Sequence, residues 1–189
     1  MLRIFLATAM LFGGFAVSLP GLVQAESTGA IQHALHERYQ PSRMDVSNRT
    51  LAGHLSKRGS VLLLQADGAP AQALRFVQLN TKSPRFHVRD YARVMVAQDG
   101  ALTSGKGDFT LPKGTRLGVL DLKVDRDQVH VFTHTLEPVR LADGNTAYGC
   151  TEFVFPLDPG VRNRADVAAV SSEIDRVLRP AATTANALS

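Results

Sequence analysis

The chain has 189 residues and a single cysteine, Cys150. An intrachain disulfide is therefore excluded, and the fold must be stabilised by packing. Unpaired cysteine is among the most frequently buried residue types, so we expect Cys150 to be an inert core thiol. The alternative is a nucleophile paired with His130 or His134 on a neighbouring strand, which requires a thiolate in contact with an orienting base.

Catalytic and metal-binding motifs are missing as well. No Gly-x-Ser-x-Gly segment occurs, and the Gly-Lys-Gly segment lacks the spacing and hydroxyl of a phosphate-binding loop. His33, His36 and Glu37 do not follow the order of the zinc proteases. His130 and His134 lie four residues apart on a predicted strand, about 13 Å, too far to share an ion. We predict no catalytic residue, no metal and no cofactor.

No apolar run reaches the length of about 20 residues that spans a bilayer. The longest covers residues 4–17, follows Arg3 and is ended by Pro20, and a Val-Gln-Ala triplet finishes at Ala25. This layout is typical of a cleaved secretory signal. We predict a signal peptide over residues 1–25, a periplasmic or secreted bacterial protein, and no stable transmembrane segment after cleavage.

The net charge is +4 and the isoelectric point is about 9.6. A basic chain approaches acidic partners more readily. For an exported protein the available polyanions are lipopolysaccharide, phospholipid headgroups and acidic glycans. We therefore predict an anionic envelope component or another protein as partner, and no nucleic acid.

Short strand-like segments, separated by glycine and proline turns, dominate the chain after the signal. They are residues 60–65, 74–79, 85–96, 116–124, 129–136 and 147–155. A four-residue connection joins the fourth and fifth, and one register aligns their apolar residues, so we predict a hairpin. Its pairs are Val124 with Val129, Leu122 with Val131 and Leu120 with Thr133. The glycine-rich stretch 99–114 is interpreted as a surface loop.

Two helices are predicted at the ends of the domain. The first begins at Ser27 or Thr28, where a hydroxyl can cap it, and ends before Pro41. The second follows Asn163, is stopped by Pro180, and has apolar residues at helical spacing.

Strands bracketed by two helices, with no alternating strand–helix rhythm, favour an α+β, mainly β fold. We predict a single domain over residues 26–180. Its expected architecture is a small antiparallel sheet or an SH3-like or OB-like barrel, flanked by an N-terminal and a C-terminal helix. The small and polar residues 181–189 are predicted to form a disordered tail.

The chain resembles a family of uncharacterised exported bacterial proteins. The resemblance lies in residues 57–65, Asp67-Gly68, residues 114–124 and a terminal helix beginning near residues 165–167. It covers most of the predicted mature chain in pattern more than in identity. It implies the same domain organisation and carries over no functional residue.

One segment alternates cationic with apolar side chains. Its polar positions are Arg85, His87, Arg89, Tyr91 and Arg93. Alternate residues on a strand lie about 6.6 Å apart, and arginine binds phosphate or carboxylate through a rigid fork. These five residues are the predicted ligand-binding site for an extended anion, although such a pattern is also typical of a solvated outer face.

The sequence therefore predicts an exported, non-enzymatic binding or envelope-associated domain that recognises an anionic envelope component or a protein partner. Two alternatives stay open. One is a hydrolytic or redox enzyme that uses Cys150 with a histidine. The other is a structural subunit of an envelope assembly, which would expose an apolar patch of several hundred Å².

Overall fold

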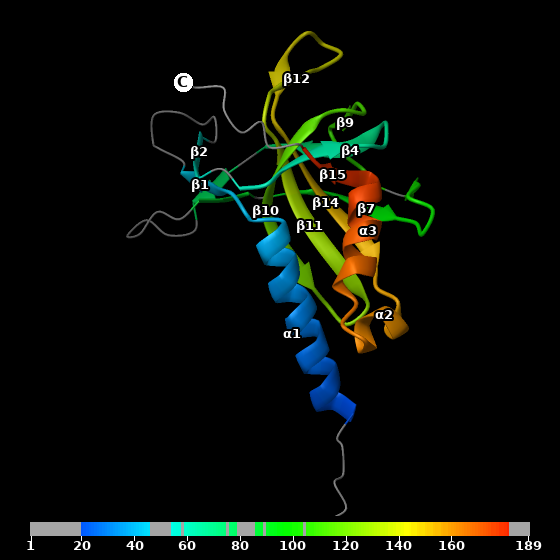
Figure 1. Ribbon diagram of the computed structural model, residues 1–189. Coiled ribbons are helices and arrows are strands. Elements are labelled where there is room, and N and C mark those ends of the chain that lie inside the picture. Colours follow the sequence, from blue (N-terminus) through cyan, green and yellow to red (C-terminus); the bar gives the residue numbers. More distant parts are fainter. Residues whose placement is uncertain are drawn as a thin grey trace, which may run out of the picture.

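The computed structural model describes residues 20–45, 54–57, 59–74, 76–78, 86–88, 90–103 and 105–181. Its side chains are described except at residues 20–25, 43–45, 54–57, 76–78 and 86–88. Over these residues the fold is mainly β, with a curled, open half-barrel and a few helices (Figure 1). The predicted α+β, mainly β class is confirmed.

A nine-stranded sheet forms the half-barrel. Its strands are β3 (Val61–Leu64), β4 (Ala69–Ala73), β7 (Ala92–Val96), β8 (Leu102–Thr103), β9 (Phe109–Leu111), β10 (Arg116–Val124), β11 (Gln128–Thr135), β14 (Gly149–Pro156) and β15 (Leu178–Pro180). The hydrogen-bonded order is β15-β3-β10-β11-β14-β4-β9, and β7 pairs with both β14 and β8. β7 runs parallel to β14, and the other described pairs in this sheet are antiparallel.

Three two-stranded sheets accompany the half-barrel. They are β1 (Arg43–Asp45) with β2 (His54–Lys57), β5 (Phe76–Gln78) with β6 (Phe86–Val88), and β12 (Val139–Arg140) with β13 (Thr146–Ala147). Asp143 begins the turn between the last two strands, and its carboxylate accepts hydrogen bonds from the backbone and side-chain amides of Asn145 at 2.9 Å each. Gly144 follows in this turn at a φ of +86°, a conformation that favours glycine.

Three helices complete the described structure: α1 (Pro20–Arg38), α2 (Pro159–Asn163) and α3 (Val167–Val177). α1 and α3 lie side by side in front of the three long strands β10, β11 and β14 (Figure 1). Asp166 caps α3, because its side chain accepts a hydrogen bond from the Ala169 amide at 3.0 Å. No helix of the described residues is long and apolar enough to cross a membrane.

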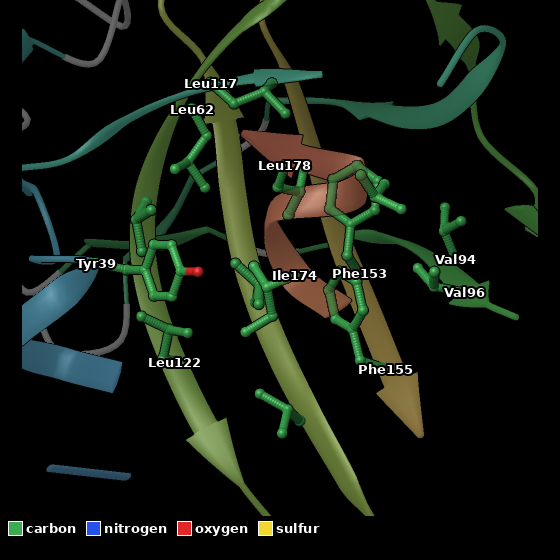
Figure 2. Close-up of a cluster of buried hydrophobic side chains, with 14 of the residues drawn as sticks. Tyr39, Leu62, Val94, Val96, Leu117, Leu122, Phe153, Phe155, Ile174 and Leu178 are labelled. Atoms are coloured by element: carbon green, nitrogen blue, oxygen red, sulfur yellow. The ribbon is translucent and has the colours of Figure 1, made fainter. Parts of the chain in front are cut away.

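The core lies between the helices and one face of the sheet. Residues in register across a sheet share a face, and one row points toward the helices: Val94, Phe153, Val131 and Leu122. All four are at most 1% exposed. Ile174 and Leu178 from the C-terminal segment, and Tyr39 from the end of α1, close the cluster from the other side (Figure 2). The helices are therefore held by apolar burial, which contributes about 25 cal/mol per Å².

Gln32 attaches α1 to the sheet as well. β3 pairs with β10 only at residues 116–118, so the later part of β10 has no strand on the edge away from β11 among the described residues. There the Gln32 amide takes the place of a strand: its Nε2 donates to the Leu122 carbonyl and its Oε1 accepts from the Val124 amide, both at 2.6 Å. A residue one turn from the predicted helix start thus completes the sheet.

Replacing Gln32 by leucine removes both hydrogen bonds. The Val124 amide is then left without its partner, while the Leu122 carbonyl keeps a second bond, from Nε2 of His36 at 2.9 Å. We expect Gln32→Leu to lower the free energy of unfolding by about 1–3 kcal/mol, measured as a lower midpoint in urea. His33→Leu is the matched control, because the neighbouring His33 side chain is 77% exposed. Equal midpoints for the two variants would show that the amide does not hold the helix.

The predicted hairpin is confirmed with one change of register. Val124 pairs with Val129 and Leu122 with Val131, as expected. Thr133 pairs with Val119 and not with Leu120, because the register shifts between Val119 and Asp121. A bulge of this kind inserts one residue into one strand, and it returns Asp121 to the outer face.

Several element boundaries were predicted wrongly. The segment 85–96 is divided between β6 and β7, which belong to different sheets, and the break falls at the position of Asp90. The stretch 99–114 contains β8 and β9 in addition to turns. β4 and β15 were not predicted, since each contains a proline. α1 begins at Pro20 and runs across the predicted cleavage position after Ala25.

Candidate functional site

The structure describes only part of the predicted anion-binding segment. Arg85 and Arg89 lie outside the described residues, and His87 lies on β6 with its side chain not described. Tyr91 directly precedes β7, and Arg93 lies on β7. Because β6 pairs with β5 and β7 pairs with β14, the segment is not one continuous strand with a single ladder of cations.

Arg93 is part of a charged network on the outer face of the sheet. Its Nε lies 3.8 Å from Oε1 of Glu152, its register partner on β14. The same carboxylate oxygen lies 2.7 Å from Nδ1 of His130. His130 Nε2 lies 3.1 Å from Asp125 Oδ2, with an alignment too poor for a hydrogen bond. Arg93 therefore faces a carboxylate of its own chain, which reduces its attraction for an external anion.

Tyr91 and Phe132 form the aromatic part of this outer face. Their rings meet edge to face with centroids 5.2 Å apart. Burial raises the pKa of the Tyr91 phenol, and nearby Cys150 adds to the shift. The Lys123 ammonium lies 5.4 Å from the centre of the Phe132 ring. Tyr91 is thus a half-buried residue that packs against Phe132, whereas Lys123 and Arg93 are exposed cations on the same face.

Cys150 lies on the same outer face, opposite His134 in register, and is fully buried. Burial raises the pKa of its thiol to about 12, so the thiolate is scarce at neutral pH. His134 Nδ1 donates to the Thr135 carbonyl at 2.7 Å, and its Nε2 has no hydrogen-bond partner. Burial also lowers the pKa of His134. Among the described residues, no imidazole nitrogen of β11 is bonded to the thiol.

The histidines do not form a metal centre in the described part of the chain. No group of three metal-ligating side chains lies close enough together there. His130 and His134 remain on one strand, four residues apart, as predicted. His130 is directed to Glu152 and Asp125, two partners that the hairpin pattern did not indicate.

A pocket of about 350 Å³ opens where the sheet, α2 and α3 meet. Its described lining is Ala97, Gln98, Val129, Phe155, Pro156, Leu157, Asp158, Val161, Ala169, Val170 and Glu173. Phe155 and Val129 are register partners at the end of the core, so the floor of the pocket is continuous with the core. The volume lies within the range of small-molecule sites, about 300–1,000 Å³.

Polar groups occupy only part of the pocket lining. Asp158 caps α2, because its Oδ1 accepts from the amides of Gly160 at 2.7 Å and Val161 at 3.1 Å. Glu173 Oε1 lies 3.1 Å from the Arg176 guanidinium, which also donates to the Gln98 carbonyl. Arg176 thereby ties the turn after β7 to α3. An apolar cavity with a few placed polar groups is the usual form of a ligand site.

The sequence did not predict this pocket. Its walls come from four separate stretches of chain, near residues 97, 129, 155–161 and 169–173. Because these stretches are far apart in the sequence, no local pattern indicates the pocket.

No protein-family model, curated protein or solved structure matches this chain. The case for a function therefore rests on the geometry described above. The resemblance to uncharacterised exported bacterial proteins stays a prediction.

Proposed function

We propose that this chain is an exported, non-enzymatic binding domain whose ligand occupies the pocket between β14, α2 and α3. The observation that carries the proposal is a cavity of about 350 Å³ that continues the apolar core to the surface. An open pocket of this volume with a mostly apolar lining has the usual form of a small-molecule site. An apolar ligand that occupies it would remove the lining from water, which is favourable.

The signal sequence supports the exported part of the proposal. Ile31 and Leu35 of α1, and Tyr39 directly after it, are fully buried in the core and lie after the predicted cleavage position. Removal of residues 1–25 would therefore leave these contacts in place. The more specific SH3-like or OB-like topology belongs to this proposal as a prediction, since small closed barrels of that kind often carry ligands.

The burial of Cys150 and the absence of a described hydrogen bond from its thiol to an imidazole favour binding over the cysteine-enzyme alternative. An anionic envelope component on the outer face stays a second prediction, supported by the exposed cations Arg93 and Lys123. It is weaker because Glu152 lies against Arg93. An envelope subunit is a further prediction that rests on the sequence alone.

Nile red, a neutral apolar dye whose emission rises in apolar surroundings, tests the proposal directly. We expect saturable binding of one dye per chain to protein purified from the periplasm of an expressing bacterium. Ala169→Phe fills the pocket and should weaken binding at least about tenfold, equivalent to about 1.4 kcal/mol. Ala168→Phe places the same ring on the exposed side of α3 and serves as the matched control.

Circular dichroism of each variant before titration establishes that it is folded. The proposal fails if the parent protein shows no saturable dye binding. It also fails if folded Ala169→Phe binds the dye as tightly as Ala168→Phe does.

A further inference from the structure

The chemistry of the pocket mouth indicates which class of ligand fits, an inference that rests on the proposed function. Among the described lining residues, two carry charge, and both are carboxylates: Asp158 and Glu173. No lysine, arginine or histidine lines the cavity there. The remaining polar side chain is Gln98, and the rest of the lining is apolar.

Both carboxylates keep an oxygen that has no described partner. Oδ1 of Asp158 caps α2, and no described bond involves its Oδ2. Oε1 of Glu173 pairs with Arg176, and no described bond involves its Oε2. The Glu173 side chain lines the pocket and is 44% exposed, so it lies where the pocket meets solvent.

Two of the nearest arginines are bound to groups of their own chain. Arg176 binds Glu173 and the Gln98 carbonyl. Arg162 is buried and donates to the Arg126 carbonyl. The Arg164 guanidinium lies near Gly160, as Oδ1 of Asp158 does, but Arg164 is not among the described lining residues. Because exposed charges are screened over about 8 Å at physiological salt, the groups in direct contact with a ligand decide which head group it prefers. In the pocket lining these charged groups are carboxylates, which accept hydrogen bonds.

We propose that the pocket binds a small amphiphile with an apolar body and a cationic ammonium head. The apolar body would lie against Phe155, Val129 and Val170, where burial of apolar surface is favourable. The ammonium group would lie at the mouth, where its N–H donors can bind a carboxylate oxygen of Asp158 or Glu173. A carboxylate or phosphate head would instead face the Asp158 carboxylate and the Glu173 carboxylate, which Arg176 pairs on one oxygen.

Three amphiphiles with the same chain and different heads separate this inference from the proposed function. They are decylamine, decanol and decanoate, titrated calorimetrically into the whole processed protein below their micelle concentrations. We expect decylamine to bind more tightly than decanol, and decanoate most weakly. The amine preference should fall as salt is raised.

Glu173→Gln removes one carboxylate and keeps the shape of the side chain. We expect it to weaken decylamine binding about two- to fivefold, the loss typical of one partly exposed ion pair, and to weaken decanol binding less. Glu137→Gln is the control, because Glu137 also pairs with an arginine, Arg116 at 2.8 Å, and lies outside the described pocket lining.

Each outcome decides between the two ideas. If Nile red binds in the pocket but decanol or decanoate equals decylamine, the cationic preference is wrong and the proposed function stands. If Glu173→Gln and Glu137→Gln affect decylamine equally, the carboxylate is not part of the site and the inference is wrong. If neither dye nor any amphiphile binds, both proposals fail.

Discussion

Phe153→Ala is expected to lower the free energy of unfolding by about 3–5 kcal/mol, the usual cost of truncating a buried aromatic residue. Phe153 is fully buried at the centre of β14. It lies between its register partners Val94 and Val131, beneath α3 (Figure 2). The backbone of a central strand cannot collapse into the space, so a cavity remains. Since small domains are stable by about 5–15 kcal/mol, this variant should be close to unfolding at 37 °C.

Phe155, two residues further along the same strand and on the same face, is the matched comparison. It is equally buried, at 2% exposure, but one side of it borders the pocket. Phe155→Ala should therefore cost less stability than Phe153→Ala, because the ring already lacks packing partners on that side. Urea denaturation of both variants measures the difference. Equal losses would mean that the pocket is not open space in solution, which would also count against the proposed function.

Local patterns predicted those parts of the fold that depend on neighbouring residues. The β10–β11 hairpin has a short connection and a matching apolar register, and both are visible in the sequence. The bulge is not, because Val119 and Leu120 are both apolar and either can face the core before Asp121. The stripe of α3 was predictable for the same local reason: Val170, Ile174 and Val177 are all buried.

Elements that exist through distant partners were missed. β15 is an edge strand that pairs with β3 more than a hundred residues earlier, and Pro180 is acceptable there because an edge strand need not donate every amide. β4 pairs with β9 inside the stretch interpreted as a loop. A proline or a run of glycines suggests a turn locally, whereas the pairing that overrides it comes from tertiary structure.

On the outer face, too, the sequence predicted the direction of a side chain but not its partner from a distant strand. Alternation identified Arg93 as outward-facing, which is correct. Its partner Glu152 arrives through the parallel pairing of β7 with β14, and the intervening chain gives no local sign of that pairing. Alternation in the sequence therefore predicted a row of cations without the carboxylate that pairs with Arg93. The pocket lining comes from four separate stretches, so no sequence pattern predicted it.

Native protein should be nearly inert to a thiol-specific reagent at Cys150. The thiol is fully buried, and burial raises its pKa to about 12, so reaction requires opening of the structure. For a domain stable by about 5 kcal/mol, global opening exposes the thiol in about one molecule in several thousand. We expect Cys150 in the native protein at neutral pH to be labelled at least about a thousandfold more slowly than in denaturant. The extent of labelling is measured from the mass of the intact chain.

An added cysteine on the surface gives this measurement its internal standard. Ala168→Cys places a thiol on the exposed side of α3, where it should react at the rate of a free thiol and give one label per chain while Cys150 stays silent. Two rapid labels would show that Cys150 is accessible and reactive. Because a nucleophilic cysteine needs both access and an activating base, that result would favour the cysteine enzyme over the binding domain. A single label would show that Cys150 is a buried thiol that contributes only to packing.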